Sequence, residues 1–102
     1  DRGAAIDAKD REGKTPLAKA AEADKLGVMK LLIERGADVN ARAVDGATPL
    51  FAAAKEDRGP AVALLLARGA DPNLPGPQGL RPLAVAAFNG STESVEALLK
   101  LL

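Results

Sequence analysis

An internal repeat of 33 residues constrains this chain more than any other feature. Residues 13–17 (GKTPL) return as 46–50 (GATPL) and as 79–83 (GLRPL). Residues 36–40 (GADVN) return as 69–73 (GADPN), with a degenerate copy at 3–7 (GAAID), and an alanine pair recurs at 20–21, 53–54 and 86–87. The period contains no insertion or deletion, so the chain must stack units of one shape in one direction.

Each unit contains the signals for two short helices. Thr15 and Thr48 can cap a helix whose first residue is Pro16 or Pro49, where the missing N–H does no harm. Breaks are expected near Asp24, Asp57 and Gly90, and Gly36 and Gly69 are placed to end the second helices in a left-handed conformation. The pattern predicts helices at 16–22, 25–34, 49–56, 60–67, 82–88 and 92–101.

Apolar residues at helical spacing predict the core. In the first helices these are Leu17, Ala20, Ala21, Leu50, Ala53, Ala54 and, by register, Leu83. In the second helices they are Val28, Met29, Leu32, Ile33, Val62, Leu65, Leu66, Val95, Leu98 and Leu99. One such unit cannot bury its own apolar face, so the units are expected to stack into a solenoid.

A 33-residue repeat that opens on Thr-Pro-Leu resembles the ankyrin family, in which each unit is a turn followed by two helices. The resemblance implies an all-α ankyrin-repeat solenoid of stacked helix-turn-helix units with projecting β-hairpin-like loops. It also implies one domain over residues 1–102, with a stub at 1–9 and repeats at 10–42, 43–75 and 76–102.

The chain departs from the family pattern at several positions. The family places a histidine after Thr-Pro-Leu that links neighbouring repeats by hydrogen bonds, whereas this chain has Ala18, Phe51 and Ala84 there and no histidine at all. Arg81 replaces the capping threonine of the third repeat, and the loop at 74–79 contains two prolines. Ser91 is expected to cap the last helix.

Composition excludes several classes of function. Without Cys, His or Tyr the usual nucleophile–base pairs cannot form, so we expect no enzyme, no cofactor and no metal site. Fourteen basic and 14 acidic residues are mixed along the chain, so no basic surface for nucleic acid or membrane is expected. The absence of cysteine is typical of an intracellular protein, in the cytoplasm or the nucleus.

Three short motifs have a structural and a functional interpretation. Asp7, Asp10 and Glu12 with Gly13 resemble a calcium loop without its ligand spacing, and a solvated turn is favoured. Residues 98–102 (LLKLL) match a receptor-docking helix, but core packing of Leu98 and Leu99 is favoured. Residues 89–91 (NGS) form a glycosylation sequon, and a turn between two helices is favoured.

The resemblance implies that a protein partner contacts the loop tips and the exposed side of each first helix. The loop candidates are Arg11, Glu12, Lys14, Arg42, Val44, Asp45, Ala47, Pro75, Pro77, Gln78 and Leu80, and the helix candidates are Glu22, Ala23, Lys55, Glu56, Phe88 and Asn89. Of these, Leu80 and Phe88 are expected to border one groove, with Lys55 and Glu56 on the same side. The alternative is that Phe88 folds inward and fills space left by alanines.

Three functions fit this sequence. The first is a protein-binding scaffold or a piece of one, and the second is an engineered repeat scaffold with no evolved partner. The third is an array that self-associates through its ends, since neither end has the polar outer face of a capping repeat.

Overall fold

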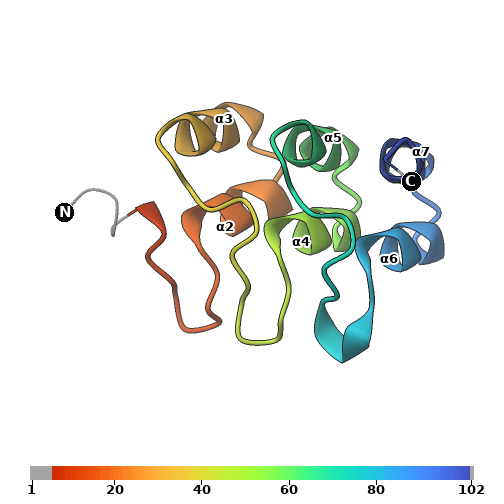
Figure 1. The fold of residues 1–102 in the computed structure, drawn as a ribbon, viewed down its shortest axis with the longest axis horizontal. Helices are drawn as coiled ribbons and strands as arrows, with labels where there is room; N and C mark the ends of the chain where they lie inside the picture. The colour runs from red at the N-terminus through yellow and green to blue at the C-terminus, as the bar shows by residue number, and fades with distance from the viewer. Residues whose placement is uncertain (1–5, 102) are drawn as a thin grey trace.

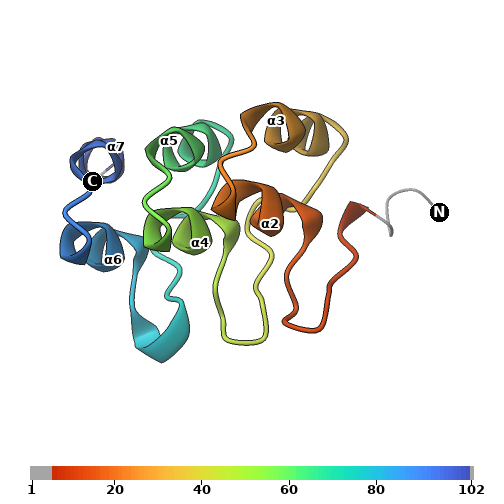
Figure 2. The ribbon, with the colours of Figure 1, turned by 180° about the vertical axis from the view of Figure 1, so that it is seen from behind.

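The computed structural model describes residues 6–101, which form two layers of helices (Figures 1 and 2). One layer contains α2 (Pro16–Glu22), α4 (Pro49–Lys55) and α6 (Pro82–Phe88), and the other contains α3 (Leu26–Glu34), α5 (Gly59–Ala67) and α7 (Thr92–Leu99). The loops project from the α2–α4–α6 layer, and the third loop contains a 3-10 turn, η1 (Pro77–Gly79). No strand occurs within residues 6–101. The predicted all-α solenoid of helix pairs is confirmed.

Threonine hydroxyl groups cap the N-termini of α2 and α4, as predicted. Thr15 Oγ1 accepts a hydrogen bond from the Ala18 N–H at 3.3 Å, and Thr48 Oγ1 accepts one from the Phe51 N–H at 3.2 Å. In the third repeat the Ala84 N–H instead donates to the Arg81 carbonyl at 3.0 Å. The expected cap at Ser91 is wrong, because its side chain accepts no capping hydrogen bond although it occupies the N-cap position of α7.

The helices end in a repeated left-handed turn. Asp24 and Asp57 follow α2 and α4 with φ of 57° and 60°, and Gly36 and Gly69 follow α3 and α5 with φ of 95°. Each turn is closed by a backbone hydrogen bond to the carbonyl five residues earlier, as at the ends of many helices; one example is the Arg58 N–H, which donates to the Ala53 carbonyl at 2.8 Å. Asp tolerates this conformation better than most side chains, so the predicted breaks fall where the backbone requires them.

Small side chains hold the α2–α4–α6 layer together. Leu17, Ala21, Leu50 and Ala54 are fully buried, as predicted for this face. Alanines at these positions let adjacent helices approach closely, and the core is aliphatic apart from Phe51. The predicted burial of Leu17 and Leu50 is therefore confirmed, and Leu83 is half-buried.

Two predicted core residues are exposed. Val28 is 51% exposed and Leu99 is 52% exposed. The residue one period after Val28 is Ala61, which is fully buried. Val28 and Leu99 lie in the first and last helix pairs of the described array, which have a described neighbouring pair on one side alone. The repeat register predicts which positions face an adjacent repeat, but it does not indicate whether an adjacent repeat is present at that end of the described array.

Hydrogen bonds from side chains link neighbouring repeats, although the histidine of the family pattern is absent. Asn40 Oδ1 accepts from the Asp71 N–H at 2.8 Å, and one period earlier Asp7 Oδ1 accepts from the Asp38 N–H at 3.1 Å. Arg58 Nε donates to the Glu22 carbonyl at the end of α2 at 2.8 Å. These bonds satisfy backbone groups of one repeat with side chains of an adjacent one, and they fix the spacing between units.

A buried hydroxyl without a partner gives a test of this packing. Ser94 in α7 is fully buried and its Oγ has no hydrogen-bond partner, whereas Ala61 stands at the same place in the second repeat. Removing an unsatisfied buried polar group recovers its desolvation penalty, so Ser94→Ala should raise the free energy of unfolding by about 1 kcal/mol. Chemical denaturation measures this, with Thr48→Ala as a control that should lose about 1 kcal/mol with its cap. A loss for Ser94→Ala would contradict the assignment.

Candidate protein-binding groove

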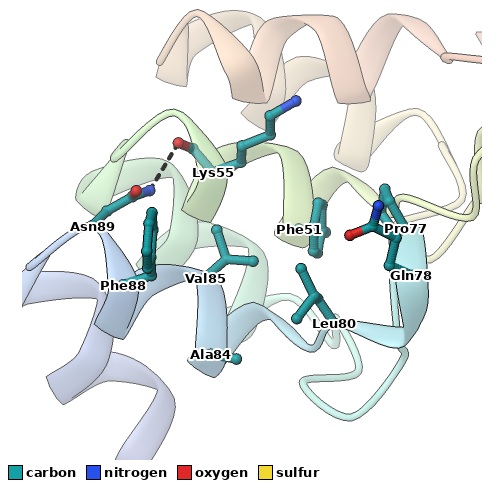
Figure 3. Close-up of a pocket in the computed structure, with 9 residues that line it drawn as sticks. All are labelled: Phe51, Lys55, Pro77, Gln78, Leu80, Ala84, Val85, Phe88 and Asn89. Atoms are coloured by element: carbon teal, nitrogen blue, oxygen red, sulfur yellow. Dashed lines mark hydrogen bonds between the residues drawn. The ribbon is translucent and has the colours of Figure 1, made fainter.

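A groove of about 670 Å³ lies where the second and third repeats meet (Figure 3). Its walls come from α4, α6 and the η1 loop. The lining residues are Phe51, Lys55, Pro77, Gln78, Leu80, Ala84, Val85, Phe88 and Asn89. Most of these side chains are apolar, and the volume falls in the range of about 300–1,000 Å³ that is typical of ligand pockets.

Phe51 forms the floor of the groove. Its side chain is 3% exposed, and it occupies the position that the family gives to histidine. The third loop passes directly over the ring at Gly76, where an added Cβ would lie 2.6 Å from Phe51 Cδ2. The Gly76 N–H donates to the Leu80 carbonyl at 2.6 Å, which closes the η1 turn and holds Leu80 at the mouth of the groove, 43% exposed.

Phe88 is the most exposed large apolar side chain of the described residues, at 90%. It is the last residue of α6, and its equivalents one and two periods earlier are Lys55 and Glu22, both surface positions. The alternative in which Phe88 folds into the core is therefore wrong. Phe88, Leu80 and Lys55 line one groove as predicted, whereas Glu56 is not among the lining residues.

Asn89 fixes the end of α6 against α4. Its Nδ2 donates to the carbonyl of Lys55 at 2.9 Å (Figure 3) and to the carbonyl of Ala54 at 3.2 Å. Because both carbonyls belong to the last turn of α4, the neighbouring Phe88 is held at a fixed place above the groove. The same bonds give Asn89 of the sequon a structural role in the turn between helices.

Lys55 is the single charged residue that lines the groove, and within residues 6–101 it makes no ion pair. The corresponding surface of the first repeat is charged but internally paired. There Lys14 Nζ lies 2.8 Å from Glu22 Oε2, and this hydrogen bond raises the pKa of Lys14. Lys19 Nζ lies 3.1 Å from Asp10 Oδ2. The pKa of Asp10 is lowered, first by the Lys14 backbone N–H and then by Lys19.

The other candidate residues are dispersed. Arg11, Glu12, Val44 and Asp45 are exposed at the first two loop tips, Ala23 and Glu56 are exposed after α2 and α4, and Pro75 is half-buried. Arg42 is exposed and donates to the Gly46 carbonyl at 3.1 Å and to the Pro75 carbonyl. Ala47 is buried, so the prediction that its side chain lies at the loop surface is wrong.

Sequence reasoning missed Phe51, Ala84 and Val85 as lining residues. Ala84 and Val85 lie four and three residues before Phe88, which places them on the same helical face, so the spacing alone could have identified them. Phe51 lies four residues before the candidate Lys55 and one period before Ala84, so the same spacing could have identified it as well.

Two of the remaining motifs receive structural explanations. Asp10 Oδ1 accepts backbone hydrogen bonds from Glu12 at 2.9 Å and Lys14 at 3.0 Å, so this carboxylate closes the first loop. Among the described residues no group of three or more His, Cys, Asp or Glu side chains could hold a metal ion. Leu98 of the receptor-docking motif is 1% exposed and belongs to the core, while Leu102 lies outside the described residues.

Comparison with known protein families agrees with this architecture. The family model for ankyrin repeats (3 copies) matches residues 2–76 and 42–101. The chain belongs to the ankyrin repeat family. Ankyrin repeats are generally non-catalytic modules for protein–protein interaction. A search of curated proteins gave no significant match. Within the part of the ankyrin chain that is described, no helix has the length and apolar character needed to cross a membrane.

The contact between Gly76 and Phe51 can be tested by adding one methyl group. Because an alanine Cβ would overlap the ring, Gly76→Ala should lower the free energy of unfolding by about 1–3 kcal/mol. Gly27→Ala in α3 is the matched control, since nothing lies within 4 Å of its added Cβ, and it should leave stability unchanged or slightly higher. Equal effects of the two substitutions would show that the loop does not rest on Phe51.

Proposed function

We propose that this ankyrin array is a non-catalytic protein-binding module that holds a segment of its partner in the groove between α4 and α6. One observation carries the proposal: Phe88 is 90% exposed beside an apolar groove. Exposing an aromatic ring to water is unfavourable, and interface anchors are typically large residues surrounded by smaller contacts that exclude water. Val85, Ala84 and Leu80 are suited to be those surrounding contacts.

The contacts that hold the walls of the groove support this role. α6 is tied to α4 by Asn89, and the η1 loop rests on Phe51. These contacts hold the backbone of both walls before a partner docks, and binding loses less affinity when the surface is already ordered. The exposed loop tips at Val44 and Asp45 would add peripheral contacts to the same partner.

The experiment is selection of binders from a displayed random peptide library, followed by affinity measurement on variants. Phe88→Ala should weaken the selected peptides by about tenfold or more, as expected for an anchor residue, and should leave the thermal midpoint nearly unchanged. Leu31→Ala on α3, which removes another half-exposed apolar side chain, should leave peptide affinity unchanged. Failure to select peptides, or equal affinity for wild type and Phe88→Ala, would contradict the proposal.

A second candidate function is self-association through the outward faces of the first and last helix pairs. Val28 and Leu31 on α3 are 51% and 49% exposed, and Leu99 and Leu101 are each 52% exposed. The inner counterparts of Val28, Ala61 and Ser94, are both fully buried against an adjacent repeat. The exposed face at one end of the array corresponds to a face that is buried between repeats inside it. Such a face is suited to pack against the opposite end of a second copy, stacked head to tail.

Sedimentation equilibrium tests this second function. The average mass should rise with protein concentration, and Leu31→Lys should reduce the rise because it puts a charge on the proposed contact. Glu34→Gln, which makes the same one-unit positive change at another exposed residue of α3, serves as the control for general electrostatic effects. A single monomer mass over the whole concentration range would contradict self-association and would leave the groove proposal untouched.

A further inference from the structure

We infer that the segment held in the groove combines a large apolar side chain with a carboxylate, and that Lys55 binds the carboxylate. The inference rests on the proposed function and adds the chemistry of the partner to it. It depends on how apolar and charged groups are distributed around the groove.

The apolar side chain is required by the walls. Phe88, Val85 and Leu80 line the groove from α6 and the loop, and Phe51 closes its floor (Figure 3). Asn89 Nδ2 already donates to the Ala54 and Lys55 carbonyls, so the amide nitrogen is engaged. A polar side chain packed against Phe51, Val85 and Leu80 would lose hydrogen bonds to water that these apolar side chains cannot replace, whereas an aliphatic or aromatic one would not.

The carboxylate follows from the repeat register. In the first repeat the cation Lys14 lies against Glu22 at 2.8 Å. One period later the same two positions hold Ala47 and Lys55, so the second repeat has a cation at the acid's position and no charge at the other. Lys55 therefore has no counterpart of the Lys14–Glu22 ion pair within its own repeat, and its ammonium group is left to bind an external anion.

No acidic residue lines the groove to oppose this preference. Glu56 follows Lys55 in sequence but is not a lining residue, and Glu22 is already held by Lys14. A positive potential at the rim of an apolar groove favours an anionic side chain over a cationic one beside the apolar anchor. The pair would be partly exposed, so its contribution is expected to be modest, about two- to fivefold in affinity.

The test uses peptides selected from a displayed random library, each synthesised in a Glu form and an otherwise identical Gln form. A tryptophan in each peptide reports binding by fluorescence, because the chain itself contains no Trp or Tyr. On the wild-type array the Glu form should bind about two- to fivefold more tightly than the Gln form, and the difference should shrink as salt is added. Lys55→Met should abolish the difference, and Lys55→Glu should reverse it.

The matched control is Lys30→Glu, which makes the same charge change on an exposed residue of α3 and should preserve the preference for the Glu form. Selected peptides rich in basic residues, equal binding of the Glu and Gln forms, or a preference that survives Lys55→Met would each overturn the inference. Peptides that depend on Phe88 but show no preference for Glu would overturn this inference alone. Failure to select any peptide would overturn the proposed function and this inference together.

Discussion

The close contact among α2, α4 and α6 is the interaction on which the rest of this molecule depends. Leu17, Leu50 and the alanine pairs at 20–21 and 53–54 are buried, and α4 packs against both α2 and α6, so no helix pair can reach its final packing without a neighbour. Side chains that reach one period along the array, such as Arg58 to the Glu22 carbonyl, then fix the distance between units. Because the spacing is constant, every surface position recurs in a row across the three repeats.

These rows explain how a regular fold acquires a local apolar groove. The row that contains Glu22, Lys55 and Phe88 changes from acidic to basic to aromatic, and the row that contains Lys14, Ala47 and Leu80 changes from charged to apolar. In the first repeat Lys14 and Glu22 form an ion pair with each other. The third repeat instead presents an apolar wall, with Lys55 at its rim. The core stays nearly constant while the rows vary, so the proposed specificity lies in substitutions that cost the fold little.

Much of this arrangement could be predicted from the sequence, because the period transfers information from one repeat to the next. Register predicts the helices, the caps at Thr15 and Thr48, and the glycines that follow the second helices. It also predicts that Leu80 and Phe88 line the same groove. The exposure of Val28 and Leu99 did not follow from register, because register identifies a contacting face without stating whether a neighbour covers it. The η1 turn and the contact of Gly76 with Phe51 did not either, because the 74–79 loop (LPGPQG) shares only its last glycine with the equivalent 41–46 loop (ARAVDG), so its path could not be inferred from that loop.

Nuclear magnetic resonance of the array bound to a selected peptide tests the central claim most directly. The claim is that the partner's apolar side chain lies between Phe88 and the η1 loop, above Phe51. Intermolecular nuclear Overhauser effects should then join that side chain to the ring of Phe88 and to the methyl groups of Val85 and Leu80, with little change at α3 and α5. Contacts confined to the first two loop tips, or to the outer faces of α3 and α7, with no effect at Phe88, would contradict the account.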